Sequence, residues 1–217
     1  MILAVLLGAV AGAVWAEPYW IAYEGNEFPE NDGWLHYASS PPAQRWLENG
    51  SLFIDSRADP NITDIYGMYP TSGLDPEPGE TFLMTWRLNV YEAAPWEYPG
   101  VGLRSDERYA VAFIFAEDYL WSVYEPFVLV QFTPGMFHEF ELRSTDMRTY
   151  ELYLDGAFAV EGAFCESLFP PGLWWGDILR GGSSFGAWDY FRFGVVPEPG
   201  TLVLMFFGAA ALRGKEV

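Results

Sequence analysis

Alternation of inward and outward residue types at positions 137–143 and again at 150–154 is the feature that most constrains the fold of this chain. His138, Phe140 and Leu142 alternate there with charged residues. Successive side chains of a strand point to opposite faces, so this period of two predicts a strand with one buried face and one wet face. His138 falls on the buried face, and we expect it to point inward and to hydrogen-bond the backbone rather than to act as a general base.

An Asp-Gly pair at positions 155 and 156 continues this strand pattern into a hairpin. Tyr150, Leu152 and Leu154 share one face before the pair, and Phe158 and Val160 are expected to continue the same apolar face after it. Asp-Gly favours a two-residue type I′ turn, which matches the twist of two antiparallel strands. A second layer must cover the apolar face of such a hairpin, so the segment predicts one sheet of a sandwich.

Short runs of β-branched and aromatic residues recur between turn residues along the rest of the body. They lie at residues 51–56, 81–90, 109–116, 119–124, 127–132 and 188–193. Glu117-Asp118 is expected to form a tight hairpin turn, and the nearly all-apolar run 127–132 is expected to be buried on both faces. Hardly any amphipathic helical pattern accompanies them, so the sequence predicts an all-β fold of two antiparallel sheets.

The N-terminus carries an unbroken run of apolar and small residues at positions 2–14. It is followed by Val14-Trp15-Ala16 and then Glu17-Pro18, which places small residues at −3 and −1 of a cleavage point after Ala16. This order is typical of a secretory signal peptide, and the run is too short to span roughly 30 Å of hydrocarbon. We expect residues 1–16 to be such a signal, although no basic residue precedes Arg45; a buried helix is the alternative.

The C-terminus combines a proline-rich box with an apolar run. Val196, Pro197, Glu198 and Pro199 are followed by apolar residues 202–212 and then by two basic residues. The prolines fix φ and favour an extended strip, whereas the short apolar run favours a helix. This order resembles the PEP-CTERM sorting signal of bacterial exosortase substrates. The resemblance implies export, transient association with the inner membrane, cleavage near the box, and delivery to the cell surface or the exopolysaccharide matrix.

A second resemblance covers most of the body. The segment FHEFELRSTDMRTYELYLDGAFAVEG, the earlier GSLFIDS and the later AWDYFRFG together resemble the laminin-G-like, concanavalin A-like jelly-roll family. The resemblance implies an antiparallel jelly-roll β-sandwich at residues 17–194, between the signal peptide and a sorting tail at 195–217. It also implies a role towards sugars or the extracellular matrix, without specifying a ligand.

Composition excludes several classes of function. The 217 residues include 30 acidic and 11 basic side chains, a formal charge of −19 that would repel nucleic acid and anionic lipid. Cys165 is the single cysteine, so neither an internal disulfide nor a thiolate metal cluster can form. With only two histidines, the sequence provides little for zinc enzymes or histidine-dependent triads.

Carboxylates are the remaining candidates for catalysis or for a metal ion. Jelly-roll glucanases carry a Glu-x-Asp-x-x-Glu pattern on one face of a strand, and here Leu35 stands where the last acid would follow Glu30 and Asp32. Glu139 and Glu141 are expected to be solvated on an outer face. We therefore expect no catalytic residues. Asp55, Asp59 and Asp64 could offer oxygens to Ca²⁺, but their spacing matches no calcium loop. Asp189 is expected to anchor the neighbour of its strand, with a Ca²⁺ contact as the alternative, so no cofactor is predicted.

Aromatic residues in Pro/Gly-rich segments are the candidate ligand contacts, because rings stack on the apolar faces of sugars. Trp96 and Tyr98, and Trp174 and Trp175, lie in such segments and are expected in loops. Packing under those loops is the alternative for all four. Trp121 and Trp188 lie in predicted strands and are expected in the core.

Taken together, these features predict an exported, non-enzymatic β-sandwich that binds glycan or has a structural role in the matrix. Its expected partners are the secretion machinery, an exosortase and a polysaccharide. A secreted polysaccharide hydrolase or lyase on the same scaffold, and a protein-binding adhesin, are the alternatives.

Overall fold

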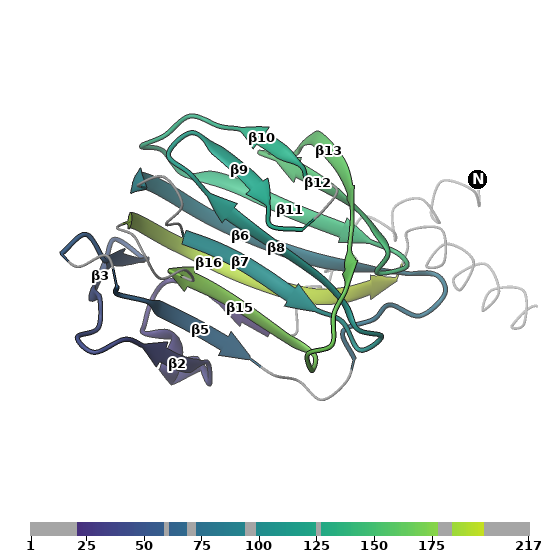
Figure 1. Cartoon of the computed structure of the whole chain (residues 1–217), viewed down its shortest axis with the longest axis horizontal. Coiled ribbons are helices and arrows are strands. Elements are labelled where there is room, and N and C mark those ends of the chain that lie inside the picture. The colour runs from purple at the N-terminus through teal and green to yellow at the C-terminus, as the bar shows by residue number, and fades with distance from the viewer. Residues whose placement is uncertain are drawn as a thin grey trace, which may run out of the picture.

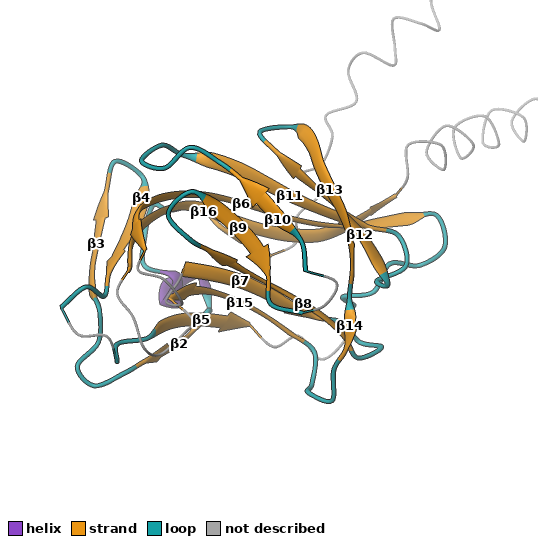
Figure 2. Cartoon of the chain, turned by 45° about the horizontal axis from the view of Figure 1, so that its top comes forward, coloured by secondary structure: helices purple, strands orange, loops and turns teal. Residues whose placement is uncertain are grey.

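The computed structural model describes residues 21–58, 61–68, 73–93, 99–124, 127–177 and 184–197. Two antiparallel sheets pack face to face, with one in front of the other in Figure 1 and one above the other in Figure 2. The predicted all-β, two-sheet jelly-roll sandwich is confirmed. The signal peptide with Ala16, and the tail beyond Pro197, lie outside the described residues, which contain no helix long and apolar enough to cross a membrane.

The first sheet, called sheet A, has eight strands. Its order is β13 (Ala157–Ala163), β12 (Thr149–Leu154), β11 (His138–Ser144), β6 (Glu80–Ala93), β16 (Ser184–Pro197), β4 (Ser51–Asp55) and β3 (Gln44–Glu48), with β1 (Ile21–Tyr23) paired to β16. The two long strands β6 and β16 lie side by side at its centre, so segments near the middle and the end of the body form one unit (Figure 2).

The second sheet, called sheet B, also has eight strands. Its order is β10 (Leu129–Gln131), β9 (Tyr119–Ser122), β8 (Tyr109–Phe115), β7 (Pro99–Arg104), β15 (Gly172–Asp177), β5 (Asp64–Met68) and β2 (Leu35–Ala38), with β14 (Cys165–Glu166) paired to β8. A short 3₁₀ helix, η2 (Pro29–Asp32), precedes β2 and ends at Gly33, whose φ of 85° suits glycine.

Aromatic residues from both sheets fill the space between them. Trp175 of β15 is fully buried, and its ring lies 4.9 Å from that of Tyr23, 4.7 Å from that of Tyr66 and 5.1 Å from that of Trp188. Buried aromatic pairs of this kind add about 0.5–1.5 kcal/mol each beyond the area they bury. The core position predicted for Trp188 is confirmed, and Trp175 lies at the centre of the core.

Two details of the predicted strands are wrong. Residues 127–132 contribute only the short edge strand β10, in which Leu129 is 59% exposed while Val130 is buried, because an edge strand has one open face. A register shift in the β12–β13 pair after Leu152 places Phe158 opposite Tyr153, so Phe158 is 58% exposed and does not continue the apolar face. The Asp155-Gly156 turn itself is present, with φ of 50° and 77°.

A cluster of charged side chains links the two sheets at the edges formed by β2 and β3. His36 of sheet B lies 2.9 Å from the fully buried Asp64. Arg45 of sheet A donates to Glu30 at 2.7 Å and to the hydroxyl of Tyr66 at 2.5 Å. Burial raises the pKa of Asp64 above its ordinary value. For Glu30, burial also favours a higher pKa, but the hydrogen bond from Arg45 and the nearby positive charges outweigh it and lower the pKa. The positive and negative groups compensate each other there, so the cluster has a structural role.

The long strand β16 extends past the predicted end of the body. Val196 pairs with Thr81 and Pro197 with Glu80, so the first two residues of the proline-rich box belong to sheet A. Val196 is half-buried and Pro197 is exposed. Glu198 and Pro199 lie outside the described residues.

Candidate functional site on the outer face of sheet B

The outward faces of the two sheets differ in chemistry. On sheet A, the outward side chains include three ion pairs, Arg87 with Asp189, Arg143 with Glu141, and Arg192 with Glu24. Exposed ion pairs of this type contribute little to stability and favour solvation. The other end of the same face carries stacked rings, those of Trp46, Phe53, Tyr91 and Phe185. The charges of this face are therefore paired within the chain, beside a cluster of rings.

Sheet B presents an apolar outward face. Its core-facing residues, such as Leu173, Trp175 and Phe113, are buried, so the residues between them point outward. Three registered rows make up this face: Leu35, Gly67, Trp174, Gly102 and Ala112; Gly172, Arg104, Ala110 and Cys165; and Tyr37, Ile65, Gly176, Gly100, Ile114, Trp121 and Leu129. Within these rows Arg104 is the single charged residue.

Trp174 covers the centre of this face. Its indole lies directly on the backbone of Gly102, where an added Cβ would stand 2.1 Å from two ring carbons. Only glycine therefore allows the ring to lie this close to β7. The side chain is half-buried.

Arg104 completes the centre of the site. Its Cζ lies 4.6 Å from the Trp174 ring and 4.8 Å from the ring of Phe169, which is 65% exposed in the loop between β14 and β15. A guanidinium that contacts aromatic rings still has planar N–H groups that can donate hydrogen bonds. Among the described residues, Arg104 makes no ion pair.

A hydrogen-bonded loop fixes the turn that follows Arg104. The carboxylate of Asp75 accepts the backbone N–H groups of Asp106 and Glu107 at 2.9 and 3.0 Å. Asp106 in turn accepts the N–H groups of Gly73 and Leu74 at 2.6 and 3.1 Å. Burial raises the pKa of Asp75 even though these bonds oppose the shift. The reciprocal bonds tie residues 73–75 to the β7–β8 turn, at the same end of sheet B as Arg104.

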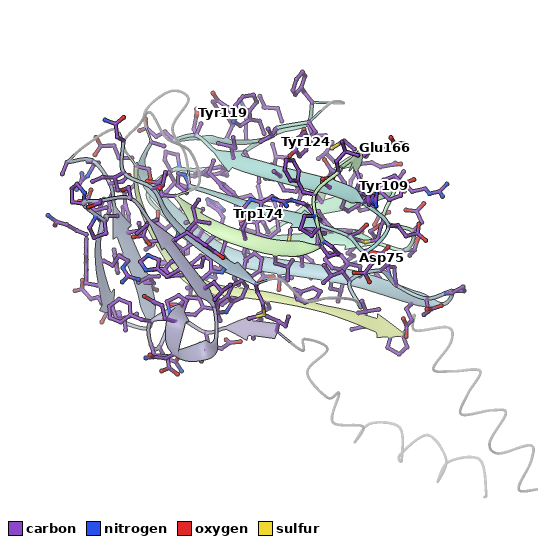
Figure 3. The ribbon with its side chains drawn as sticks, turned by 60° about the horizontal axis from the view of Figure 1, so that its bottom comes forward. Asp75, Tyr109, Tyr119, Tyr124, Glu166 and Trp174 are labelled. Atoms are coloured by element: carbon purple, nitrogen blue, oxygen red, sulfur yellow. The ribbon has the colours of Figure 1, made fainter. Side chains whose placement is uncertain are left out.

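Exposed apolar side chains flank the central residues. Leu35 and Tyr37 on β2 are about half exposed, and Tyr124, which follows β9, is 38% exposed. Figure 3 shows Tyr109, Tyr119, Tyr124 and Glu166 around the strands that carry Trp174. The smaller residues between them, such as Gly67, Ala112 and Ile114, are buried. The exposed apolar side chains therefore lie at the two edges of this face, on either side of Trp174.

The structure separates the aromatic residues that the sequence grouped together. Trp174 and Trp175 lie in strand β15 rather than in a loop, so their side chains point to opposite faces. Trp174 reaches the surface, whereas the prediction that Trp175 contacts a ligand is wrong because it is fully buried. Trp121 is half-exposed on the outer face rather than in the core. Trp96 and Tyr98 lie outside the described residues.

The polar candidates have structural partners. His138 points inward as predicted, with Nε2 2.9 Å from the carbonyl of Thr133 and Nδ1 2.7 Å from Asp155. Glu141 contacts Arg143, and Glu139 accepts from the hydroxyl of Tyr190, so both lie on the outer face of sheet A.

The described aspartates considered for Ca²⁺ do not lie together in one site. Asp55 is bound by Arg57 on sheet A, Asp64 is in the buried cluster at the edge of sheet B, Asp189 pairs with Arg87, and Asp59 lies outside the described residues. Within the described ranges no group of three histidine, cysteine or acidic side chains is arranged to hold a metal ion.

Sequence comparison places the chain in no known group, since no family model and no curated protein matches it. Solved structures do match its fold. A carbohydrate esterase from the Shiga toxin-encoding bacteriophage phi24B matches with a TM-score of 0.63 at 12% identity, over 83% of this chain and 99% of that one. The Crh5 transglycosylase, solved in complex with NAG, matches with a TM-score of 0.51 at 9% identity, over 82% and 83% of the two chains.

A third similar structure is a larger protein. A structure of botulinum neurotoxin type C, described by its interaction with two ganglioside molecules, matches with a TM-score of 0.54 at 10% identity. The match covers 89% of this chain and 51% of that one. At these identities the comparisons show the sandwich fold and nothing finer.

Proposed function

We propose that this protein is an exported, non-catalytic module that binds glycan at the cell surface or in the extracellular polysaccharide, through the outer face of sheet B. The observation that carries the proposal is the placement of Trp174, whose half-exposed indole is fixed on Gly102 beside Arg104. Sugar rings have apolar C–H faces that pack on aromatic side chains and hydroxyl groups that need polar partners. An aromatic surface with one hydrogen-bond donor group meets both needs.

The similar structures support a ligand of this class. One is a carbohydrate esterase, one was solved in complex with NAG, and one is described by its interaction with gangliosides. Shared fold alone does not transfer a function, so these names agree with the proposal and do not replace the site argument.

Binding rather than hydrolysis is favoured by the chemistry of the face. Glycoside hydrolysis needs two carboxyl groups on either side of the scissile bond. The three registered rows of sheet B, as far as the structure describes them, contain no carboxylate. A hydrolase or lyase would therefore need its acids from elsewhere in the chain.

The test is glycan binding by residues 17–196, with Trp174→Ala as the variant and Phe158→Ala as the matched control. Phe158 is an exposed aromatic residue on sheet A, so its loss changes the surface without touching the proposed site. We expect binding on a glycan array that Trp174→Ala reduces at least about tenfold and Phe158→Ala leaves intact, with both variants still folded and unfolding in one cooperative thermal transition. Equal binding by Trp174→Ala and the parent would refute the site. Release of reducing or unsaturated ends from the bound polysaccharide would replace binding with catalysis.

Export and sorting form the second part of the proposal. Residues 1–16 would direct export with cleavage after Ala16, and the box from Val196 to Pro199 would be recognised by an exosortase while the tail is held in the inner membrane. The extended end of β16 at Val196 and Pro197 supports recognition as a strand. Replacing Pro197 and Pro199 together with alanine should leave a full-length, membrane-retained protein in the producing bacterium. Normal release of that variant would refute the sorting role.

A further inference from the structure

Arg104 is one of three described arginines, with Arg108 and Arg148, that form no ion pair, and among these three it alone contacts Trp174. Arg45, Arg57, Arg87, Arg143 and Arg192 each form an ion pair with a carboxylate. Such pairing is expected in a chain with 30 acidic side chains and 11 basic ones, since an arginine has many potential partners. Arg104 instead contacts two aromatic rings and, among the described residues, no carboxylate.

The surroundings of Arg104 explain why none of the described carboxylates reaches it. Gly172 on one side, and Ala110 followed by Cys165 on the other, occupy its row across sheet B. The nearest acids along the chain belong to the turn that follows, where Asp106 is held by the N–H groups of Gly73 and Leu74. Arg104 is thus half-buried and contacts two rings, with no described carboxylate paired to its guanidinium, which makes it a candidate partner for an anion from outside.

We infer that the site on sheet B selects glycans that carry a carboxylate, with the uronic acid group bound by Arg104 and the sugar next to it packed on Trp174. This inference rests on the proposed function and names its ligand class. A planar guanidinium matches a carboxylate with two parallel hydrogen bonds, which are stronger than bonds to neutral hydroxyl groups. The contacts with Trp174 and Phe169 restrict the arginine side chain in advance, which reduces the entropy lost on binding.

The net charge of the protein limits how acidic the ligand can be. A formal charge of −19 repels a dense polyanion, whereas the repulsion of one carboxylate is screened over the Debye length of about 8 Å at physiological salt. The single guanidinium at this site also matches one carboxylate. The preferred ligand is therefore a polysaccharide in which an occasional uronic acid is flanked by neutral sugars.

Matched polysaccharides test this selectivity. We would measure binding to glucuronoxylan, hyaluronan and alginate, in which uronic acids are occasional, alternate and continuous respectively, and to the carboxyl-reduced form of each. The carboxyl-reduced forms keep the chain and lose the charge. We expect at least about tenfold weaker binding to reduced than to native glucuronoxylan, and a smaller difference for alginate. Equal binding to native and reduced forms would overturn the inference.

Three variants separate the inference from the proposed function. Arg104→Gln should bind native and reduced glucuronoxylan equally, while Arg143→Gln, which removes the same charge from sheet A, should keep the parent's preference. Trp174→Ala should lose both forms. If reduced forms bind as well as native ones and Trp174→Ala abolishes both, the proposed function stands and the inference fails. If none of the six polysaccharides and no neutral glycan on the array binds, both fail.

Discussion

Gly102→Ala is the sharpest test of how the proposed site is built. It adds one methyl group beneath Trp174 and does not replace Trp174 or Arg104 themselves. The new Cβ would stand 2.1 Å from the indole of Trp174, against 3.4 Å for ordinary van der Waals contact, so the ring must retreat by about 1.3 Å. Overpacking in a closed core costs typically 1–3 kcal/mol. Here the ring is half-exposed and can swing towards solvent, so we expect a loss near the lower end, about 1 kcal/mol.

Thermal unfolding and glycan binding, measured on the same variant, report this change. A loss of about 1 kcal/mol in a domain of this size lowers the midpoint by roughly 2–4 °C. Glycan binding should fall at least about tenfold, because a displaced ring no longer aligns with Arg104. Gly186→Ala is the matched control, since its Cβ would meet nothing closer than 3.4 Å. If Gly102→Ala behaves like Gly186→Ala in both assays, the indole does not depend on the glycine and the reasoning fails.

Three further predictions concern the frame of the sandwich. Trp175→Ala should cost about 3–5 kcal/mol by removing the central core side chain, and a loss below 1 kcal/mol by denaturant unfolding would contradict that position. The hydrogen bond from Arg57 lowers the pKa of Asp55. The pair therefore stabilises the folded state at pH values above the ordinary aspartate pKa, and this stabilisation is lost as the pH falls and the carboxylate of the folded protein is protonated. In Arg57→Gln an NMR titration should therefore find Asp55 at higher pH, and an unchanged value would refute the pairing. Asp155→Asn keeps a residue that tolerates the positive φ but weakens the contact with His138, for an expected loss of about 1 kcal/mol by thermal unfolding; no loss would contradict its role.

The sequence was sufficient for the class of fold, because period-two alternation depends only on which face is buried. His138, Phe140 and Leu142 point inward as expected, and the Asp-Gly pair forms the predicted turn. Whether a strand lies at the edge or at the centre of a sheet depends on the whole topology, however, and the local sequence pattern does not show it. The apolar run at 127–132 therefore suggested a buried strand, whereas it contributes an edge strand with Leu129 exposed.

The candidate site was predictable only in part, for a related reason. Trp174 was among the expected ligand contacts, but its partner Gly102 lies 72 positions earlier and meets it only through the pairing of β7 with β15. Arg104 could not be recognised as unpaired before the ion pairs of the other arginines were known. The Pro/Gly-rich flanks of Trp174 and Trp175 suggested a loop, and one signal would have corrected this: two adjacent residues of a strand cannot both face a ligand.

The placement of Trp174 and Trp175 next to each other in β15 connects the core to the proposed site. Trp175 is held by rings from both sheets, so the backbone of β15 has little freedom at this position. Because Trp174 leaves the same backbone in the opposite direction, its ring can rest on Gly102 in a fixed orientation instead of moving with a loop. Sites on strands hold their geometry better than sites on loops, and a ring fixed before binding loses less entropy when a sugar packs on it. Substitutions that loosen Trp175 without unfolding the protein should therefore weaken glycan binding although the residue never touches the ligand.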